Sequence, residues 1–337
     1  MIRKLWYRTW QRPEPKAIIL MYHRVNKLPC DPWELSVNPD HFDQQLCLIK
    51  QKWQPVSLTE LTQRILNRSM LDRCVVFTFD DGYIDNFTEA KPLLEKYQIP
   101  ATFFVATQNC ETQTRFWWDE LQKISLEAHE LPETIKLSIA GEDVQYYLGE
   151  EATLTPLLQN KQRTWTATQV PPTRRCHLYL ALWQRMKPLA SAEQQQILME
   201  LNGLAGYVPA ANAELNCVTS DHIQKLVENP LFSIGGHTVT HPELANHSVE
   251  TQCQEISNGK SYLESIIKKP IELFAYPYGS FTDDTVKILE DVGIKSAVTT
   301  RGGPITTHSH MLQLNRYQVA NWKGNVFESQ LTRWFRS

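Results

Sequence analysis

Two pairs of polar residues in this 337-residue chain have the types and spacing needed for metal chemistry. Asp80 and Asp81 directly follow the apolar run CVVFTF, and His237 and His241 lie four residues apart in GGHTVTH. Two histidines at this spacing can face one centre, and a carboxylate from a neighbouring strand would complete three ligands. Three nitrogen and oxygen ligands with an open position are typical of a catalytic divalent metal. We therefore expect Asp81, His237 and His241 to bind a metal ion.

The second carboxylate then has a separate task. The cation would offset the charge of Asp81, and Asp80 would be free to take a proton from a water molecule whose pKa the metal lowers toward ~7. Each motif alone has a structural alternative, because Asp-Asp-Gly can cap a turn and a His-x-x-x-His pair can be structural. Their joint occurrence at strand ends, beside Gly82, Gly235 and Gly236, favours a functional site.

The segments that carry these residues alternate between strand and helix patterns. Candidate strands lie at 17–23, 74–80, 101–107, 232–238, 272–279, 295–300 and 313–320. Most are apolar throughout, as in strands buried on both faces of a parallel sheet, and amphipathic helical segments separate them. The alternation predicts an α/β fold, either a (β/α) barrel or an open doubly wound sheet. In such barrels the active site lies at the C-terminal ends of the strands.

One long segment interrupts the alternation. Residues 110–216 are polar and mainly helical, with a hairpin pattern at 134–148. We expect a lead-in at 1–16, a barrel formed by 17–109 and 217–337, and a helical insertion at 110–216. A connection of this length is usually functional, and either a substrate lid or a partner surface fits it.

The motifs resemble those of the polysaccharide deacetylases, the NodB-homology or carbohydrate esterase family 4 group. TFDDG at 78–82 and HTVTH at 237–241 are similar to its first two motifs, and FAYPYG at 274–279 resembles its third. The resemblance implies a distorted (β/α)7-8 barrel, with Asp80 as the base and Asp81, His237 and His241 as metal ligands. It also implies that the backbone N–H of Tyr278 stabilises the oxyanion. The similarity covers residues 17–109 and 217–337.

Two departures from the family pattern concern the remaining catalytic groups. Ala275 stands where the family has an arginine that orients the catalytic aspartate, and Arg316 on a later strand could supply that cation; the alternative is a structural or surface arginine. The C-terminal Leu-x-His motif of the general acid is missing, and His308 and His310 lie in a polar loop. Instead His23, in LMYHRV, resembles the acid histidine of a permuted subgroup that deacetylates exopolysaccharide such as poly-N-acetylglucosamine.

A tryptophan pair in the insertion is also open to two interpretations. FWWDEL at 116–121 resembles a segment of deacetylases found with exopolysaccharide biosynthesis enzymes. Trp117 and Trp118 could stack on sugar rings at the rim of the barrel, or pack in the core of the insertion.

The composition limits which partners and which cellular compartment we expect for this chain. The net charge of −3 does not mark a nucleic-acid binder, and seven widely spaced cysteines without a CxxC motif are typical of a reduced, cytosolic protein. We expect a cytoplasmic protein with no secretory signal and no membrane span. Residues 1–12 place Ile2, Leu5, Trp6 and Trp10 at helical spacing among basic residues, so a peripheral contact with the inner face of a membrane is one interpretation and a solvated lead-in is the other.

The function expected from the sequence is metal-dependent N-deacetylation of a glycan that contains N-acetylhexosamine, with release of acetate. Zn²⁺ is the expected ion, although Co²⁺, Ni²⁺ and Mn²⁺ tolerate the same ligands. Three alternatives stay open. The site could hydrolyse a small cyclic amide or ureide, as in allantoinases, or the chain could be a catalytically silent sugar-binding relative. Two histidines and one carboxylate also occur in non-haem iron oxygenases, but on a β-rich fold.

Overall fold

A single parallel sheet forms the body of the protein. The computed structural model describes residues 16–69, 72–206 and 216–337. All strand pairs of this sheet are parallel. In the order in which they pair, its strands are β11 (Ser296–Val298), β10 (Leu273–Ala275), β9 (Phe232–Gly236), β6 (Ala101–Val105), β5 (Cys74–Phe79), β1 (Ala17–Tyr22) and β12 (Tyr317–Gln318), with β4 (Gln54–Pro55) beside β5.

One extended segment connects the two edges of the sheet. Thr299 N–H donates to the carbonyl of Leu314 at 2.8 Å, next to β11, and three residues later Tyr317 pairs with Leu20 of β1. The sheet therefore curves into a barrel, as the strand and helix alternation predicts. Only residues 317–318 of the predicted strand 313–320 form a ladder, because the segment contacts β11 at one end and β1 at the other.

Side chains alternate between the barrel interior and the helices outside. In β5, Val75, Phe77 and Phe79 belong to the large cluster that packs under the helices, whereas Val76 belongs to the interior cluster with Phe104. This period of two places Thr78 and Asp80 on the interior side. Both faces are covered, which explains why the strands are apolar throughout.

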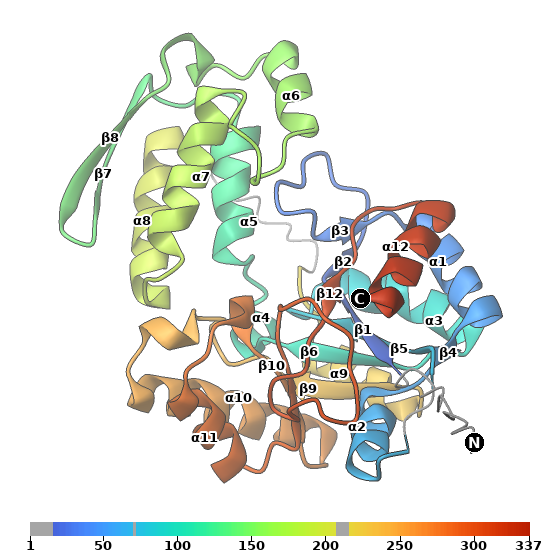
Figure 1. Ribbon diagram of the computed structural model, residues 1–337. Helices are drawn as coiled ribbons and strands as arrows, with labels where there is room; N and C mark the ends of the chain where they lie inside the picture. Colours follow the sequence, from blue (N-terminus) through green and yellow to red (C-terminus); the bar gives the residue numbers. More distant parts are fainter. Residues whose placement is uncertain (1–15, 70–71, 207–215) are drawn as a thin grey trace, which may run out of the picture.

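Helices cover the outside of the barrel (Figure 1). They are α1 (Pro39–Lys52), α2 (Leu58–Leu66), a π-helical turn (Asn86–Ala90) that continues into α3 (Lys91–Tyr97), α4 (Thr107–Thr112), α9 (Ser220–Glu228), α10 (Val249–Ile267), α11 (Asp283–Asp291) and α12 (Gly324–Arg336). Several begin at side-chain caps; for example, Ser248 accepts a hydrogen bond from Thr251 N–H at the start of α10. Two very short strands, β2 (Arg24–Val25) and β3 (Ser36–Val37), pair after β1.

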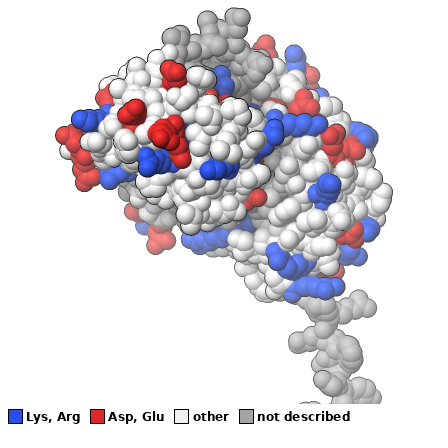
Figure 2. Space-filling view, turned by 90° about the horizontal axis from the view of Figure 1, so that it is seen from above, with Lys and Arg blue, Asp and Glu red and all other residues white. Residues whose placement is uncertain are grey.

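A second group of elements lies over one end of the barrel, as Figure 1 shows. It contains α5 (Trp117–Gln122), a π-helical turn (Lys123–Glu127), the hairpin β7 (Thr134–Ile139) and β8 (Glu142–Tyr147), α6 (Pro156–Arg163), α7 (Arg174–Met186) and α8 (Ser191–Ala205). Its apolar residues form a cluster separate from the barrel clusters. The Arg175 side chain is fully buried there and donates to the carbonyl groups of Glu151 and Ala128, both at 2.7 Å. Seen from above, acidic and basic side chains are interspersed over this face (Figure 2).

Two further expectations from the sequence concern reduced cysteines and the lack of a membrane span. All seven cysteines lie among the described residues, and no disulfide joins them. Within the described ranges, no helix combines the length and apolarity required to cross a bilayer. The predicted amphipathic segment 1–12 lies outside the described residues.

Candidate active site

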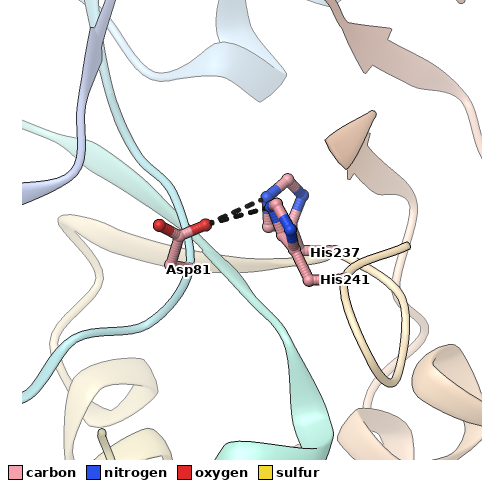
Figure 3. Close-up of side chains that lie close together, drawn as sticks. All are labelled: Asp81, His237 and His241. Carbon is pink, nitrogen blue, oxygen red and sulfur yellow. Dashed lines mark ion pairs between the residues drawn. The ribbon is translucent and has the colours of Figure 1, made fainter. Parts of the chain in front are cut away.

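The three predicted metal ligands meet at the C-terminal end of the barrel. Asp81 follows β5, and His237 and His241 follow β9; the Nε2 atoms of both histidines lie 3.3 Å from Asp81 Oδ1. Figure 3 shows both imidazole rings directed at this carboxylate. All three side chains are buried, with at most 5% of each residue exposed. Among the residues that the structure describes, this is the one group of three that could hold a metal ion.

The hydrogen bonds around these ligands fit a cation. His237 Nδ1 lies 2.7 Å from the carbonyl oxygen of Ala275, which can only accept, so the proton is on Nδ1 and the lone pair of Nε2 faces Asp81. Asp81 Oδ1 is buried without a hydrogen-bond partner among the described residues, despite its two close nitrogens. Burial lowers the pKa of His241, which favours the neutral imidazole that metals bind. Three electron-pair donors directed at one buried point are suited to a divalent metal.

The backbone at both motifs takes a left-handed conformation. Asp81 has φ 73° and Gly82 has φ 84°, and in the histidine motif Thr238 and His241 have φ 66° and 59°. Such angles cost free energy in residues with a side chain, and they are found where a site requires a particular side-chain direction. The histidine motif is held from outside by Glu255 of α10, whose Oε2 accepts 2.8 Å hydrogen bonds from the backbone of Val239 and Thr240.

Helix α10 approaches this loop closely at Gly259, which gives a stability prediction. A Cβ at Gly259 would lie 2.9 Å from the carbonyl carbon and oxygen of Thr238. We expect Gly259→Ala to destabilise the protein by about 1–3 kcal/mol, because the helix must move away from the histidine motif. In contrast, Gly203→Ala in α8 meets no atom within 4 Å and should be neutral or stabilising by up to about 1 kcal/mol. Denaturant unfolding of both variants tests this contrast, and equal effects would contradict it.

Asp80 and Arg316 form a bidentate ion pair in the barrel interior. Arg316 Nη1 donates to Asp80 Oδ1 at 2.7 Å and Nη2 donates to Oδ2 at 2.6 Å. Arg316 is fully buried, and its Nε donates to the carbonyl of Thr299 at 2.9 Å. Burial by itself would raise the pKa of Asp80, but the charge and hydrogen bonds of Arg316 outweigh burial and hold this pKa below its ordinary value of 3.8. Asp80 is therefore ionised at neutral pH.

Ala275 and Arg316 both lie in the barrel interior. Ala275 is fully buried at the end of β10 and belongs to the interior cluster with Phe104, and the Arg316 guanidinium lies 5.8 Å from the Phe104 ring. The burial of Arg316 excludes a surface arginine, and it leaves two interpretations: a cation that orients Asp80, or a structural arginine.

His23 and Tyr278 line the same pocket as the predicted ligands, a hollow of about 320 Å³. His23 follows β1, and its Nδ1 is buried without a hydrogen-bond partner among the described residues. Tyr278 lies in the turn after β10 with φ 57°, which ends the predicted strand 272–279 at Ala275. Its ring packs edge-on against His241 at 4.5 Å between centroids. The pocket is thus lined by every residue to which the sequence assigns a catalytic or ligand role except Arg316, which is buried behind Asp80.

Aromatic residues that the sequence motifs do not identify form one wall of this pocket. Trp33 and Trp183 pack at 4.2 Å between ring centroids, and both line the hollow. The ammonium of Lys187 lies 4.8 Å from the centre of the Tyr278 ring and forms an ion pair with Glu243. Trp33 lies in the segment after β2, Trp183 lies in α7 and Lys187 directly follows α7, so only the fold brings them to the site.

The two tryptophans of the insertion fit different interpretations, one at the pocket and one in the core of the insertion. Trp118 lines the pocket and packs against His241 at 4.8 Å between centroids, although only 6% of the residue is exposed. Trp117 is buried in the apolar cluster of the insertion. His308 and His310, which were not assigned a role, do not line the pocket.

Comparison with known proteins gives the family. A family model described as polysaccharide deacetylase matches residues 67–133 and 204–297. YxkH of Bacillus subtilis is 21% identical over 96% of this chain and 77% of its own length. The poly-β-1,6-N-acetyl-D-glucosamine N-deacetylase of Escherichia coli is 28% identical, but over only 27% of this chain and 14% of that enzyme.

Solved structures show the same fold over nearly the whole chain. The Streptococcus pyogenes deacetylase PplD, solved with acetate, has a TM-score of 0.55 at 23% identity and covers 96% of this chain and 99% of its own. IcaB from Ammonifex degensii has a TM-score of 0.57 at 18% identity, covering 96% and 98%. The expected NodB-like α/β barrel is confirmed. The family model and these relatives support the polysaccharide deacetylase family for this chain, and with it a hydrolase of the carbohydrate N-deacetylase class.

Proposed function

We propose that this protein uses a divalent metal to hydrolyse the acetamido group of N-acetylhexosamine units in a glycan, which releases acetate and a free amine. The observation that carries the proposal is the meeting, in one pocket, of three buried metal-ligand atoms with a carboxylate that Arg316 keeps ionised. The name of the Escherichia coli relative supports N-acetylglucosamine as the sugar.

The residues present fit a divalent cation held by Asp81, His237 and His241. A cation bound there would act as a Lewis acid on the acetyl carbonyl and lower the pKa of a water molecule. Zn²⁺ is the ion we propose, because two neutral imidazoles and one carboxylate with an open position are typical ligands of catalytic zinc. Co²⁺, Ni²⁺ and Mn²⁺ accept similar ligands, so the supply of each metal also determines which ion the site binds.

The protein groups divide the proton transfers between them. Asp80 takes a proton from the attacking water as its oxygen bonds to the acetyl carbon, and Arg316 orients the Asp80 carboxylate for this task. The backbone N–H of Tyr278 donates a hydrogen bond to the oxyanion that forms. His23 protonates the nitrogen as the C–N bond breaks, so that the amine leaves as a neutral group.

The biological setting that we propose is the synthesis of an exopolysaccharide or another cell-surface glycan. The poly-β-1,6-N-acetyl-D-glucosamine deacetylases of Escherichia coli and Staphylococcus aureus among the relatives support this setting. The tryptophans and basic residues of 1–12 support a contact with the inner face of the membrane, in the cytoplasm.

Metal content and acetate release together test the proposal. Purified protein should contain about one equivalent of transition metal and release acetate from β-1,6-linked N-acetylglucosamine oligomers. Removal of the metal with a chelator should abolish acetate release, and added Zn²⁺ should restore it. Protein that binds no metal even after addition of Zn²⁺ would reject the hydrolytic mechanism and favour a silent sugar-binding relative. Metal-loaded protein that hydrolyses a cyclic ureide but no acetylated sugar would favour the allantoinase-like alternative.

A further inference from the structure

Two buried polar residues that follow the catalytic aspartate have no part in the steps proposed above. Asp85 and Asn86 stand at the start of the π-helical turn that comes shortly after Asp80 and Asp81. Only 2% of Asp85 and 1% of Asn86 is exposed. A carboxylate or an amide is costly to bury unless its hydrogen bonds are made. The partners of these two side chains therefore indicate what they do.

Their partners lie in the segment that carries His23. Asn86 Nδ2 donates to the backbone carbonyl of His23 at 2.7 Å. Asp85 Oδ1 accepts a hydrogen bond from the backbone N–H of Val25 at 3.0 Å, and its Oδ2 accepts one from Nε of Arg24 at 2.9 Å. The two side chains thus bind His23 and both residues that follow it.

The backbone at this point needs support from outside the sheet. His23 is the single residue between β1 and β2, where the chain leaves the barrel. The N–H of Asp80 donates to the carbonyl of Tyr22 at 2.9 Å, so the carbonyl of His23 lies just beyond the pairing of β1 with β5. In β2 the neighbouring N–H groups bond to the segment of β3, and the N–H of Val25 faces the other way. The side chains at 85 and 86 satisfy both of these backbone groups.

The imidazole of His23 is not fixed by a hydrogen bond at its buried nitrogen. Its Nδ1 has no partner among the described residues, and the residue lines the catalytic pocket together with Asp80. The direction of the ring therefore depends on the backbone that carries it. Because Asp85 and Asn86 belong to the same short segment as Asp80, this segment holds the base and the predicted acid in place relative to each other. A displacement of about 1 Å in a reacting group can cost about 10²-fold in rate.

We infer that Asp85 and Asn86 are positioning residues, which hold His23 where it can protonate the leaving nitrogen. The inference rests on the proposed function, because it takes His23 to be the acid. In amide hydrolysis the water oxygen bonds to the acetyl carbon, the electron pair of the C–N bond goes to nitrogen, and nitrogen takes a proton from His23. An ester that releases 4-nitrophenolate needs no such proton, because this anion is a stable leaving group. A displaced His23 should therefore slow amide hydrolysis and spare the ester.

Rates on an amide and on an ester test this directly. The substrates are the β-1,6-linked N-acetylglucosamine tetramer and 4-nitrophenyl acetate, and the proteins are loaded with Zn²⁺. Asn86→Ala should lower kcat on the tetramer about 10–100-fold and change kcat/KM on the ester by less than about threefold. His23→Ala should show the same selectivity with a larger loss. Asp85→Asn keeps an acceptor for Val25 but loses the charge opposite Arg24, so its selective loss should be smaller than that of Asn86→Ala.

The matched control is an asparagine that makes similar bonds at the other end of the barrel. Asn229 precedes β9; its Nδ2 donates to Glu95 Oε1 at 2.8 Å and its Oδ1 accepts from the N–H of Leu231 at 3.0 Å. Asn229→Ala removes both bonds far from the catalytic end. It should leave the ratio of the two rates unchanged, even where it lowers stability.

Nuclear magnetic resonance gives a readout that does not depend on turnover. In Zn²⁺-loaded protein labelled with ¹⁵N-histidine, the ring signals of His23 are identified by their absence in His23→Ala. These signals should shift or broaden in Asn86→Ala and should match the wild type in Asn229→Ala.

The outcomes separate the positioning role from the proposed function. Equal loss on tetramer and ester in Asn86→Ala, or no loss on either, would overturn the inference, and so would unchanged His23 signals. Changed His23 signals, in a protein whose wild type releases no acetate from acetylated sugars, would support the positioning of His23 and reject deacetylation. If Asn86→Ala does not fold, Asp85→Asn provides the same comparison, and equal loss on both substrates again overturns the inference.

Discussion

Asp80→Asn should lower kcat for deacetylation by about 10²–10⁴-fold and leave close to one equivalent of metal bound. The amide cannot take a proton from water, so the step assigned to Asp80 is lost, whereas Asp81, His237 and His241 keep their geometry. His237→Ala is the matched variant, and it should lose both the metal and the activity. Elemental analysis and acetate release on the same preparations measure the two properties together.

The Asp80→Asn variant requires a control for stability. Its amide can still accept one hydrogen bond from Arg316, but the guanidinium charge is then buried without a counter-ion, and this can cost about 3–5 kcal/mol. The double variant Asp80→Asn with Arg316→Gln removes that unpaired charge and should regain much of the stability without regaining activity. Metal loss in the folded Asp80→Asn protein as complete as in His237→Ala would refute the separation of base and ligand.

The ligand motifs could be found from sequence because each sits next to a strong local signal. Asp81 directly follows an apolar strand, and His237 and His241 follow another, so parallel pairing alone brings them to one end of the barrel. The burial of the strands on both faces could likewise be predicted, because most of the strand sequences are apolar throughout. Arg316 could be proposed as the partner of Asp80 only through the missing arginine at 275, since nothing in its own segment marks it.

The aromatic wall could not be predicted in this way. Trp33, Trp183 and Lys187 meet only because the insertion folds back over the barrel, and contacts between loops far apart in sequence leave no periodic pattern. Similarly, Glu255 of α10 is half-buried against the histidine motif that it holds, but a glutamate at such a position is ordinary in any amphipathic helix. Domain boundaries and the roles of the individual site residues remain predictions.

Arg316→Met should destabilise the protein by about 3–5 kcal/mol and lower kcat about 10²-fold. The substitution keeps much of the side-chain volume but leaves Asp80 buried without its counter-ion, and it removes the two hydrogen bonds that fix the direction of the carboxylate. Denaturant unfolding gives the first quantity and acetate release at saturating substrate gives the second. Wild-type kcat in a destabilised Arg316→Met protein would mean that the arginine is structural only.

The stability difference between wild type and Arg316→Met should also depend on pH. In the wild type the pKa of Asp80 is held below 3.8, so the ion pair contributes stability above pH 3.8, and this contribution is lost as the pH falls through the lowered pKa. In the variant, burial without Arg316 raises this pKa, so acid protonates Asp80 in the folded state and relieves the penalty. The difference in free energy of unfolding should therefore be largest near neutral pH and shrink toward pH 4. A constant difference across this range would show that lost packing, rather than the ion pair, causes the destabilisation.

Moving the arginine within the barrel distinguishes positioning from simple packing. Ala275 and Arg316 both lie in the interior near Phe104, so an arginine placed at 275 could reach Asp80 once the guanidinium of Arg316 is removed. The double variant Ala275→Arg with Arg316→Ala should recover at least about tenfold in kcat over Arg316→Ala, which is about 1.4 kcal/mol of transition-state stabilisation. Ala275→Arg alone should destabilise the protein, because two guanidinium groups would compete for one carboxylate in a filled interior. Recovery of stability without recovery of kcat in the double variant would show that Asp80 needs the cation in the particular place that Arg316 provides.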